Sequence, residues 1–357
     1  MHLLTSFQHM AARSKIFITL LFTILCQESY SQAFSTSVAV DGLFDNREYK
    51  ADMTPQTIYG IRIMPEVGFD YGKHRIMGGL SKIWEFGSDS IIKPDVICYY
   101  SYMGDKWSTS FGFIPRGNLQ RQLPDAFLYD SIAFFEPVIG GTLIQYNGKW
   151  IQSELYCNWF SRQSDTRREA FRIIWDGYTG VGRVGAGWFA SMTHFAKPKQ
   201  PGHYIYDKMQ LNPYLSVDLS GLIMKDLSIK AHAGALLDHT RCRQNESKWY
   251  NTSGFLGDVQ LRWRFLDVKH TVYAANSEQA FWNDPEAGLA LHRSDPFYKH
   301  SSYNRTELGL TFVADRNVEI GFRWNIHHTP SAPIHNQQLI TVRYRIGYYK
   351  QTQSEPK

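Results

Sequence analysis

Apolar and polar side chains alternate residue by residue over long stretches of this chain, and this period of two constrains its fold more than any other feature. In the segment 318–326 (VEIGFRWNI) every second residue is apolar, and 258–265 and 340–348 repeat the pattern. A period of two belongs to a β-strand with one apolar and one polar face, whereas no segment of useful length shows the helical period of 3.6. The sequence therefore predicts an all-β protein.

The same alternation divides the chain into about sixteen strands, and the connections between them alternate in length. Two-residue turns such as Gly104-Asp105 and Asn147-Gly148 join strands in the manner of hairpins. Longer loops, such as 115–131 and 277–302, separate the hairpins from one another. The predicted strands lie near 34–44, 57–70, 75–86, 95–103, 106–114, 132–146, 149–160, 168–176, 182–194, 208–219, 227–238, 252–265, 268–276, 303–313, 317–327 and 337–349.

Composition excludes two classes of protein. After the first thirty residues, no apolar run approaches the roughly 18 to 20 residues that a membrane-spanning helix needs, so a helical membrane protein is excluded. The formal charge of +5 is dispersed along the 357 residues without a basic tract, which argues against a nucleic-acid partner. Aromatic residues make up 15% of the chain and charged residues only 20%, a profile that suits strands with an apolar face.

The polar faces of the predicted strands carry arginine, which decides between a soluble and a membrane-spanning barrel. A guanidinium group on a sheet face has to meet water, while the opposite faces hold bulky apolar groups with almost no charge. A transmembrane barrel has this arrangement, because lipid surrounds it and water fills its lumen. A secreted soluble all-β protein is the alternative. The sequence predicts a transmembrane antiparallel up-and-down β-barrel of about 16 strands, with short periplasmic turns and long extracellular loops.

The N-terminus has the pattern of a secretory signal. Arg13 and Lys15 precede the apolar stretch 16–26, and small residues follow at Ser29 and Ser31. We expect a signal peptide at 1–31, a transmembrane barrel at 32–350 and a periplasmic C-terminal tail at 351–357. The cysteines that remain after cleavage, Cys98, Cys157 and Cys242, fit neither a disulfide framework nor a metal site.

Taken together, the signal peptide, the dyad-repeat strands, the alternation of turns and loops, and the last strand (LITVRYRIGYY) resemble a bacterial outer-membrane β-barrel of the porin-like type. The SYSQ ending of the signal is similar to those of Bacteroidota envelope proteins. The resemblance implies the cell outer membrane as location, its lipids as partners and transport as activity. Two features depart from the pattern: residues 350–357 follow the last aromatic residue, and Pro65, Pro137 and Pro213 fall inside predicted strands, where we expect bulges or strand ends.

A barrel of this size encloses an aqueous channel, so the leading functional hypothesis is a diffusion channel for small solutes. A ring of fixed charges in a narrow lumen selects ions by sign, and arginine offers forked donors to acidic or polyhydroxylated solutes. We expect an Arg-lined lumen with anion preference; solvated filler paired with glutamate is the alternative for these arginines. The lumen candidates are Arg262, Arg264, Arg323, Arg343, Arg345, Glu307 and Glu319.

Two long loops supply the remaining solute-binding candidates. The segments 115–131 and 277–301 are long enough to fold inward as a constriction. Their aromatic residues, and those of the loop before the twelfth strand, suit stacking on the rings of oligosaccharides; membrane anchoring or loop packing is the alternative. The loop aromatic candidates are Trp249, Tyr250, Phe281 and Trp282.

Other functions have weaker support in the sequence. Asp238-His239 is a candidate for a rim protease, and Ser191 with His232 is a candidate pair for a lipid hydrolase, but no complete catalytic set emerges. The histidines 327, 328 and 335 share a loop without nearby carboxylates. The sequence therefore predicts a protein that is not an enzyme, with no metal site and no cofactor. An adhesin or assembly partner that acts through its long loops is the third class, and the apolar outer wall suits either a monomer or a homo-oligomer.

Overall fold

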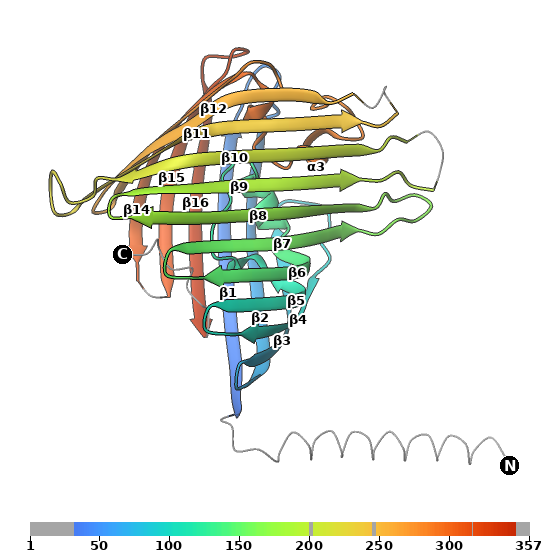
Figure 1. Ribbon diagram of the computed structural model, residues 1–357, viewed down its shortest axis with the longest axis vertical. Coiled ribbons are helices and arrows are strands. Elements are labelled where there is room, and N and C mark those ends of the chain that lie inside the picture. The colour runs from blue at the N-terminus through green and yellow to red at the C-terminus, as the bar shows by residue number, and fades with distance from the viewer. Residues whose placement is uncertain (1–31, 200–202, 245–247, 316, 348–357) are drawn as a thin grey trace.

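The computed structural model is a closed barrel of sixteen antiparallel strands (Figure 1), and it describes residues 32–199, 203–244, 248–315 and 317–347. Each strand pairs with its neighbours in sequence, and β1 pairs with β16 to close the sheet. The predicted signal peptide and C-terminal tail lie outside the described residues. The strands are β1 (Gln32–Glu48), β2 (Gln56–Tyr71), β3 (His74–Glu85), β4 (Asp95–Met103), β5 (Trp107–Pro115), β6 (Val138–Asn147), β7 (Ile151–Ser161), β8 (Ala170–Val181), β9 (Val184–Phe195), β10 (Tyr206–Asp218), β11 (Leu227–Cys242), β12 (Tyr250–Trp263), β13 (Leu266–Ala275), β14 (Ser302–Ala314), β15 (Val318–His328) and β16 (His335–Gly347).

The two rims of the barrel differ as predicted. Short turns join β2 to β3, β4 to β5, β6 to β7, β8 to β9, β12 to β13 and β14 to β15 at the periplasmic rim. The longer loops, of which 116–137 and 276–301 are the longest, lie at the extracellular rim. One connection departs from the rule, because the periplasmic turn 219–226 is longer than the extracellular loop 329–334.

The outer face of the barrel is apolar, as the alternation requires. On β2 the side chains of Tyr59, Val67 and Phe69 are exposed, and Leu211 and Leu215 are exposed on β10 at the opposite wall. A soluble protein does not leave so continuous an apolar surface in water. This surface therefore faces lipid, and the soluble all-β alternative is excluded. None of the helices in the described ranges is long and apolar enough to cross a membrane.

Two local predictions are corrected. Residues 132–135, predicted as the start of a strand, belong to the one-turn helix α2 (Asp130–Phe135), and β6 begins after Pro137. Pro65 and Pro213 lie inside β2 and β10 without a bulge, because the register on either side is unchanged. Instead, the proline and the residue before it are unpaired with the next strand, β3 or β11. This is expected because proline has no N–H to donate to the neighbouring strand.

A glycine stands close to each of these prolines on the neighbouring strand. A Cβ on Gly79 would lie 2.2 Å from the Pro65 carbonyl oxygen, and a Cβ on Gly234 would lie 2.1 Å from that of Pro213. The close approach of the two backbones at these points therefore requires glycine.

Candidate functional site

The loop 116–137 folds into the lumen, as expected for a constriction. It contains the 3₁₀ turn η1 (Arg116–Asn118) and α2, and its Leu119, Leu123 and Phe127 are buried. Side chains of the barrel wall hold its backbone: Arg172 donates a hydrogen bond of 2.6 Å to the Phe127 carbonyl oxygen, and Gln210 donates one of 3.0 Å to that of Ala126. The wall therefore supplies the donors that a backbone removed from water requires. We call this segment the first plug loop.

The loop 276–301 also folds inward, and we call it the second plug loop. It contains α3 (Gly288–His292) and the 3₁₀ turn η2 (Pro296–Lys299), and Leu291 and Phe297 are fully buried. Lys208 of β10 anchors it: the Lys208 ammonium lies 2.6 Å from Asp238 of β11 and 2.6 Å from Nδ1 of His292. A buried lysine paired with a carboxylate and a ring nitrogen fixes this loop to the wall.

The two plug loops meet inside the barrel. The Tyr129 N–H donates to the carbonyl oxygen of Arg293, and the Asp295 N–H donates to that of Asp125, both at 2.8 Å. Together with the wall they enclose a buried apolar cluster that includes Phe127, Phe297 and Tyr303. Within the described residues, the extracellular half of the lumen is therefore filled by protein.

Arg305 of β14 is the charged centre of this contact. Its guanidinium group is paired with Asp125 of the first plug loop, lies 3.6 Å from Asp295 of the second, and lies 2.7 Å from Glu307 on its own strand. All four side chains are largely or fully buried. We call them the Arg305 hub. One cation thus joins both plug loops to the wall.

Ionisation of Asp295 is unfavourable in this setting. Burial raises the pKa of Asp295 to about 7; Arg305 and the Phe297 N–H oppose the rise, and the charges of Asp125 and Asp130 add to it. The one nearby guanidinium already serves two other carboxylates, so it does not compensate a third fully.

The periplasmic half of the lumen, in contrast, presents charged side chains to water. Arg262, Arg323 and Arg343 have exposed fractions of 64%, 47% and 49%. Each has a carboxylate neighbour: Arg262 lies 3.1 Å from Asp267, and Arg343 lies 3.2 Å from Glu319. We call this region the vestibule. Its arginines are hydrated and paired at the same time.

The remaining lumen candidates take three different places. Arg345 lies 2.5 Å from Asp41 of β1, which confirms that strands at the two ends of the chain share this wall. Glu307 belongs to the buried Arg305 hub and lies 3.5 Å from Arg323. Arg264 does not face the lumen from a strand, because it occupies the turn between β12 and β13 with a φ of 54°. The prediction for Arg264 is therefore corrected, because β12 ends at Trp263 and Arg264 belongs to the hairpin turn.

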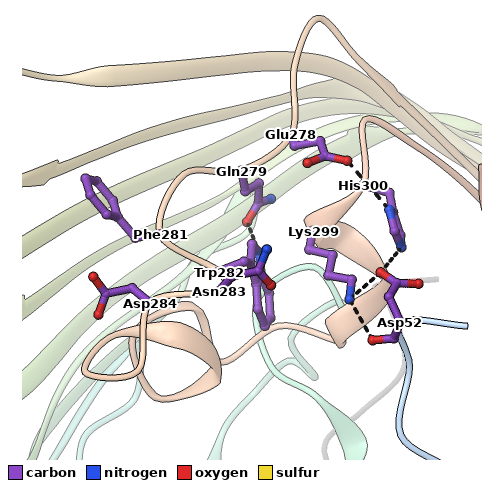
Figure 2. Close-up of a pocket in the computed structure, with 9 residues that line it drawn as sticks. All are labelled: Asp52, Glu278, Gln279, Phe281, Trp282, Asn283, Asp284, Lys299 and His300. Carbon is purple, nitrogen blue, oxygen red and sulfur yellow. Dashed lines mark hydrogen bonds and ion pairs between the residues drawn. The ribbon is translucent and has the colours of Figure 1, made fainter. Parts of the chain in front are cut away.

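A polar pocket of about 200 Å³ opens where the second plug loop meets the loop 49–55 (Figure 2). Phe281 and Trp282 of the loop aromatic candidates line it, and Trp282 stacks on His292 with ring centroids 4.4 Å apart. Tyr250 packs against Phe281 at 5.2 Å, whereas Trp249 lies apart, against Arg241. Three of the four aromatic candidates thus gather at or beside this pocket. The residues that line it are Asp52, Glu278, Gln279, Phe281, Trp282, Asn283, Asp284, Lys299 and His300.

Asp52 fixes one side of this pocket. Its carboxylate lies 2.6 Å from the Lys299 ammonium and 3.3 Å from Nε2 of His300, as the dashed lines in Figure 2 show. Partial burial raises the pKa of Asp52, but hydrogen bonds from Lys299 and Ser331 and the charge of Lys299 outweigh it and lower the pKa to about 2. The loop 49–55 is therefore held to the second plug loop by a carboxylate that stays ionised.

The hydrolase candidates pair differently from the sequence prediction. Ser191 and His232 both face the lumen, but Ser191 stands opposite Gln210, far along the wall from His232. The residue opposite His232 on β10 is Ser216, and the residue opposite it on β12 is Asp258. Nδ1 of His232 lies 3.2 Å from the Asp258 carboxylate. A serine, a histidine and an aspartate thus stand side by side on three strands, and we call them the lumenal row.

The other histidine candidates are separated. Asp238 faces inward to Lys208, while His239 faces outward and contacts Asn251, so they form no pair. His327 is buried against Phe297, whereas His328 contacts the Pro333 carbonyl oxygen outside the lumen. Among the residues that the structure describes, no group of three or more His, Cys, Asp or Glu is placed to hold a metal ion. The three cysteines are free thiols.

Sequence reasoning missed Arg305 and Ser216, although a signal for each was present. Arg305 is two residues from the predicted lumen residue Glu307, so the alternation places both on one face. Its importance depends on Asp125 and Asp295, which are loop residues outside any alternation. Ser216 follows only from the register of β10 on β11, which the sequence does not fix.

Comparison with known proteins adds two findings. A model of the lipid A 3'-O-deacylase-type family matches residues 26–188, which is less than half of the chain. No curated protein matches significantly. Solved barrels match over most of the chain: OpdL of Pseudomonas aeruginosa has 13% identity and a TM-score of 0.53 over 88% of this chain and 99% of its own. OprD of the same organism has 9% identity and a TM-score of 0.53, over 88% of this chain and 95% of its own.

The chain has the fold of outer-membrane porins. This likeness and the lipid-facing apolar wall confirm the predicted barrel, its strand number and its location in the outer membrane. The family match points in another direction, because it is to a family of enzymes. It contradicts the prediction that the protein is not an enzyme, and that prediction is corrected here.

Proposed function

We propose that this protein is an outer-membrane channel for small polar solutes in which the two plug loops form the gate. The observation that carries the proposal is the division of one lumen into a hydrated vestibule and a loop-filled extracellular half. A loop-filled segment that is held by side-chain contacts can leave the lumen without breaking the strand ladder of the wall. The barrel then supplies the pore, and the Arg305 hub sets how readily it opens.

We further propose that the vestibule favours anionic solutes. Its water-exposed charges include Arg262, Arg323 and Arg343. The partners Asp267 and Glu307 are much less exposed than the arginines they accompany, while Glu319 is about as exposed as Arg343. A permeating anion therefore meets more accessible positive than negative charge. A similar fold supports the idea: the structure of OccK2 from Pseudomonas aeruginosa, with 8% identity and a TM-score of 0.51, was determined in complex with glucuronate.

Selectivity should fall when two vestibule arginines lose their charge. For Arg323→Gln/Arg343→Gln we expect the anion-to-cation permeability ratio to fall roughly fivefold or more, because a unit charge about 4 Å away contributes about 1 kcal/mol even in bulk water. The measurement is the reversal potential of the purified protein in a planar bilayer under a salt gradient. Arg264→Gln, which removes a charge from the periplasmic turn, is the matched control. A folded, inserted wild-type barrel that never conducts would defeat the channel proposal.

Ester hydrolysis is a second candidate function, favoured by the lumenal row. The family match is to a family of enzymes, but it covers residues 26–188 and so does not include the row. We propose that Ser216 acts as the nucleophile, His232 as the general base and Asp258 as the group that orients the imidazole ring. The lumenal row lies in the periplasmic half of the lumen. The ring of Tyr214 packs against His232, with the two ring centroids 5.6 Å apart. This activity does not require the gate to open.

The hydrolase candidate predicts a steep loss of turnover in one variant. Ser216→Ala should lower kcat for a short p-nitrophenyl ester by about 10³-fold or more, as removal of a triad nucleophile does elsewhere. Ser191→Ala, which alters a lumenal serine outside the row, should leave turnover unchanged. Equal hydrolysis by the wild type and Ser216→Ala would show that the row is not the site.

A further inference from the structure

A charged cluster lies on the outer face of the barrel at its extracellular rim. His194 of β9, Asp207 of β10 and Arg241 of β11 stand in direct register across three neighbouring strands. All three alternate with lumen-facing residues, so their side chains point outward, and Arg243 follows at the end of β11. We call these four residues the rim cluster. Figure 1 shows β9, β10 and β11 running side by side to that rim.

Asp207 is the centre of the rim cluster. Its side chain is only 4% exposed although it points away from the lumen, because three cationic or potentially cationic side chains cover it. His194 Nδ1 lies 2.7 Å from the carboxylate, and the Nε atoms of Arg241 and Arg243 each donate to it at 2.8 Å. Two permanently charged guanidinium groups are thus held around one carboxylate, next to the ring of His194.

The surroundings place the rim cluster at the edge of the lipid. On the same outward face of β10, the next residues toward the periplasm are Met209 and Leu211, which are exposed and apolar. Aromatic rings flank the cluster on both sides: Phe171 lies 5.3 Å from the His194 ring and stacks with Trp159, and Trp249 lies 4.5 Å from the Arg241 guanidinium carbon. Aromatic residues of this kind mark the level of lipid headgroups.

We propose that the rim cluster binds the phosphate of a lipid headgroup in the outer leaflet. Guanidinium groups match the geometry of phosphate, and the shared Asp207 holds both of them in place before the lipid arrives. The occupant is a lipid rather than free phosphate, because the apolar strip through Met209 and Leu211 continues directly below the cluster and offers a surface for acyl chains. The site depends on the outer wall alone and holds whether or not the lumen conducts.

The test measures lipid binding by the detergent-purified protein, using native mass spectrometry. Diphosphoryl lipid A and the same lipid after enzymatic removal of its phosphates are the two probes. We expect the wild type to prefer the phosphorylated probe, and Arg241→Gln/Arg243→Gln to bind it about tenfold more weakly. Lys149→Gln/Lys225→Gln, which removes two charges from periplasmic turns, is the matched control and should bind within about twofold of the wild type.

Two further measurements keep the outcome decisive. Arg243→Gln alone alters a half-exposed side chain beyond the end of β11, so it preserves the barrel if the double variant does not fold; it should weaken binding severalfold. Inorganic phosphate at millimolar concentration should not displace the lipid. Displacement by phosphate, equal binding of both probes, or equal loss in the periplasmic control would each overturn the proposal.

Discussion

Replacing Arg305 by glutamine is expected to open the lumen. The substitution leaves Asp125, Asp295 and Glu307 close together and buried without their shared cation. Removing one partner of a buried ion pair destabilises the arrangement by roughly 3–5 kcal/mol. The strand ladder does not depend on this side chain, so we expect the loss to fall on the docking of the two plug loops. Single-channel recording should then show longer and larger openings than in the wild type.

A control separates opening from a general loss of lumen charge. Arg343→Gln removes an arginine whose carboxylate partner, Glu319, is half-exposed, so water stabilises the carboxylate that remains. We expect this variant to open as rarely as the wild type. Unchanged openings in a folded Arg305→Gln barrel would mean that the Arg305 hub does not hold the gate.

A second substitution tests whether uncompensated charge is the cause. Asp125→Asn, introduced together with Arg305→Gln, removes one of the stranded carboxylates and should restore part of the closed behaviour. Residues of one buried network couple strongly, so the double variant should open less than the sum of the two single variants.

The sequence was sufficient to predict the barrel because the alternation within each strand shows which of its side chains face lipid and which face the lumen. Val318 and Ile320 point to lipid and Glu319 to water, whichever strands lie beside them, and sixteen such segments with alternating connections leave few other architectures. The segment 132–135 was assigned wrongly because its apolar residues, taken alone, fit a buried strand as well as a helical turn. Its place in the lumen depends on contacts with β2, among them the Phe134 ring beneath the Arg62 guanidinium.

The candidate sites were harder to predict because they depend on register and on loop placement. Ser216 and His232 become neighbours only through the pairing of β10 with β11, and a row spread over three strands leaves no local motif in the sequence. The partners in the Arg305 hub are separated further, since Asp125 is 180 residues from Arg305 along the chain. A fixed spacing of residue types in the sequence does not predict such contacts, because they form only when the plug loops fold into the lumen.

The gate is expected to open as the pH rises, and Asp295 is the group that makes it do so. With the second plug loop docked, the pKa of Asp295 is about 7, and burial is the largest cause. An undocked, hydrated carboxyl has its ordinary pKa near 3.8. The docked state therefore binds the proton more tightly, so its stability is greatest below about pH 4 and is lost progressively as the pH rises through 7. These two pKa values shift the equilibrium toward the undocked state by roughly 80-fold between pH 5 and pH 8, so open probability should rise by well over tenfold.

Asp295→Asn should remove most of this pH dependence and keep the gate closed at pH 8, because an amide fills the same place without an ionisable proton. Asp226→Asn, in the exposed periplasmic turn 219–226, is the matched control and should retain the wild-type profile. Recordings from pH 5 to pH 8 in one salt distinguish the two. Asp130 of the first plug loop also has a raised pKa, caused by burial and the charge of Asp125, so any pH dependence left in Asp295→Asn should vanish in Asp130→Asn/Asp295→Asn. A profile that rises equally in all these variants would place the titrating group outside the plug.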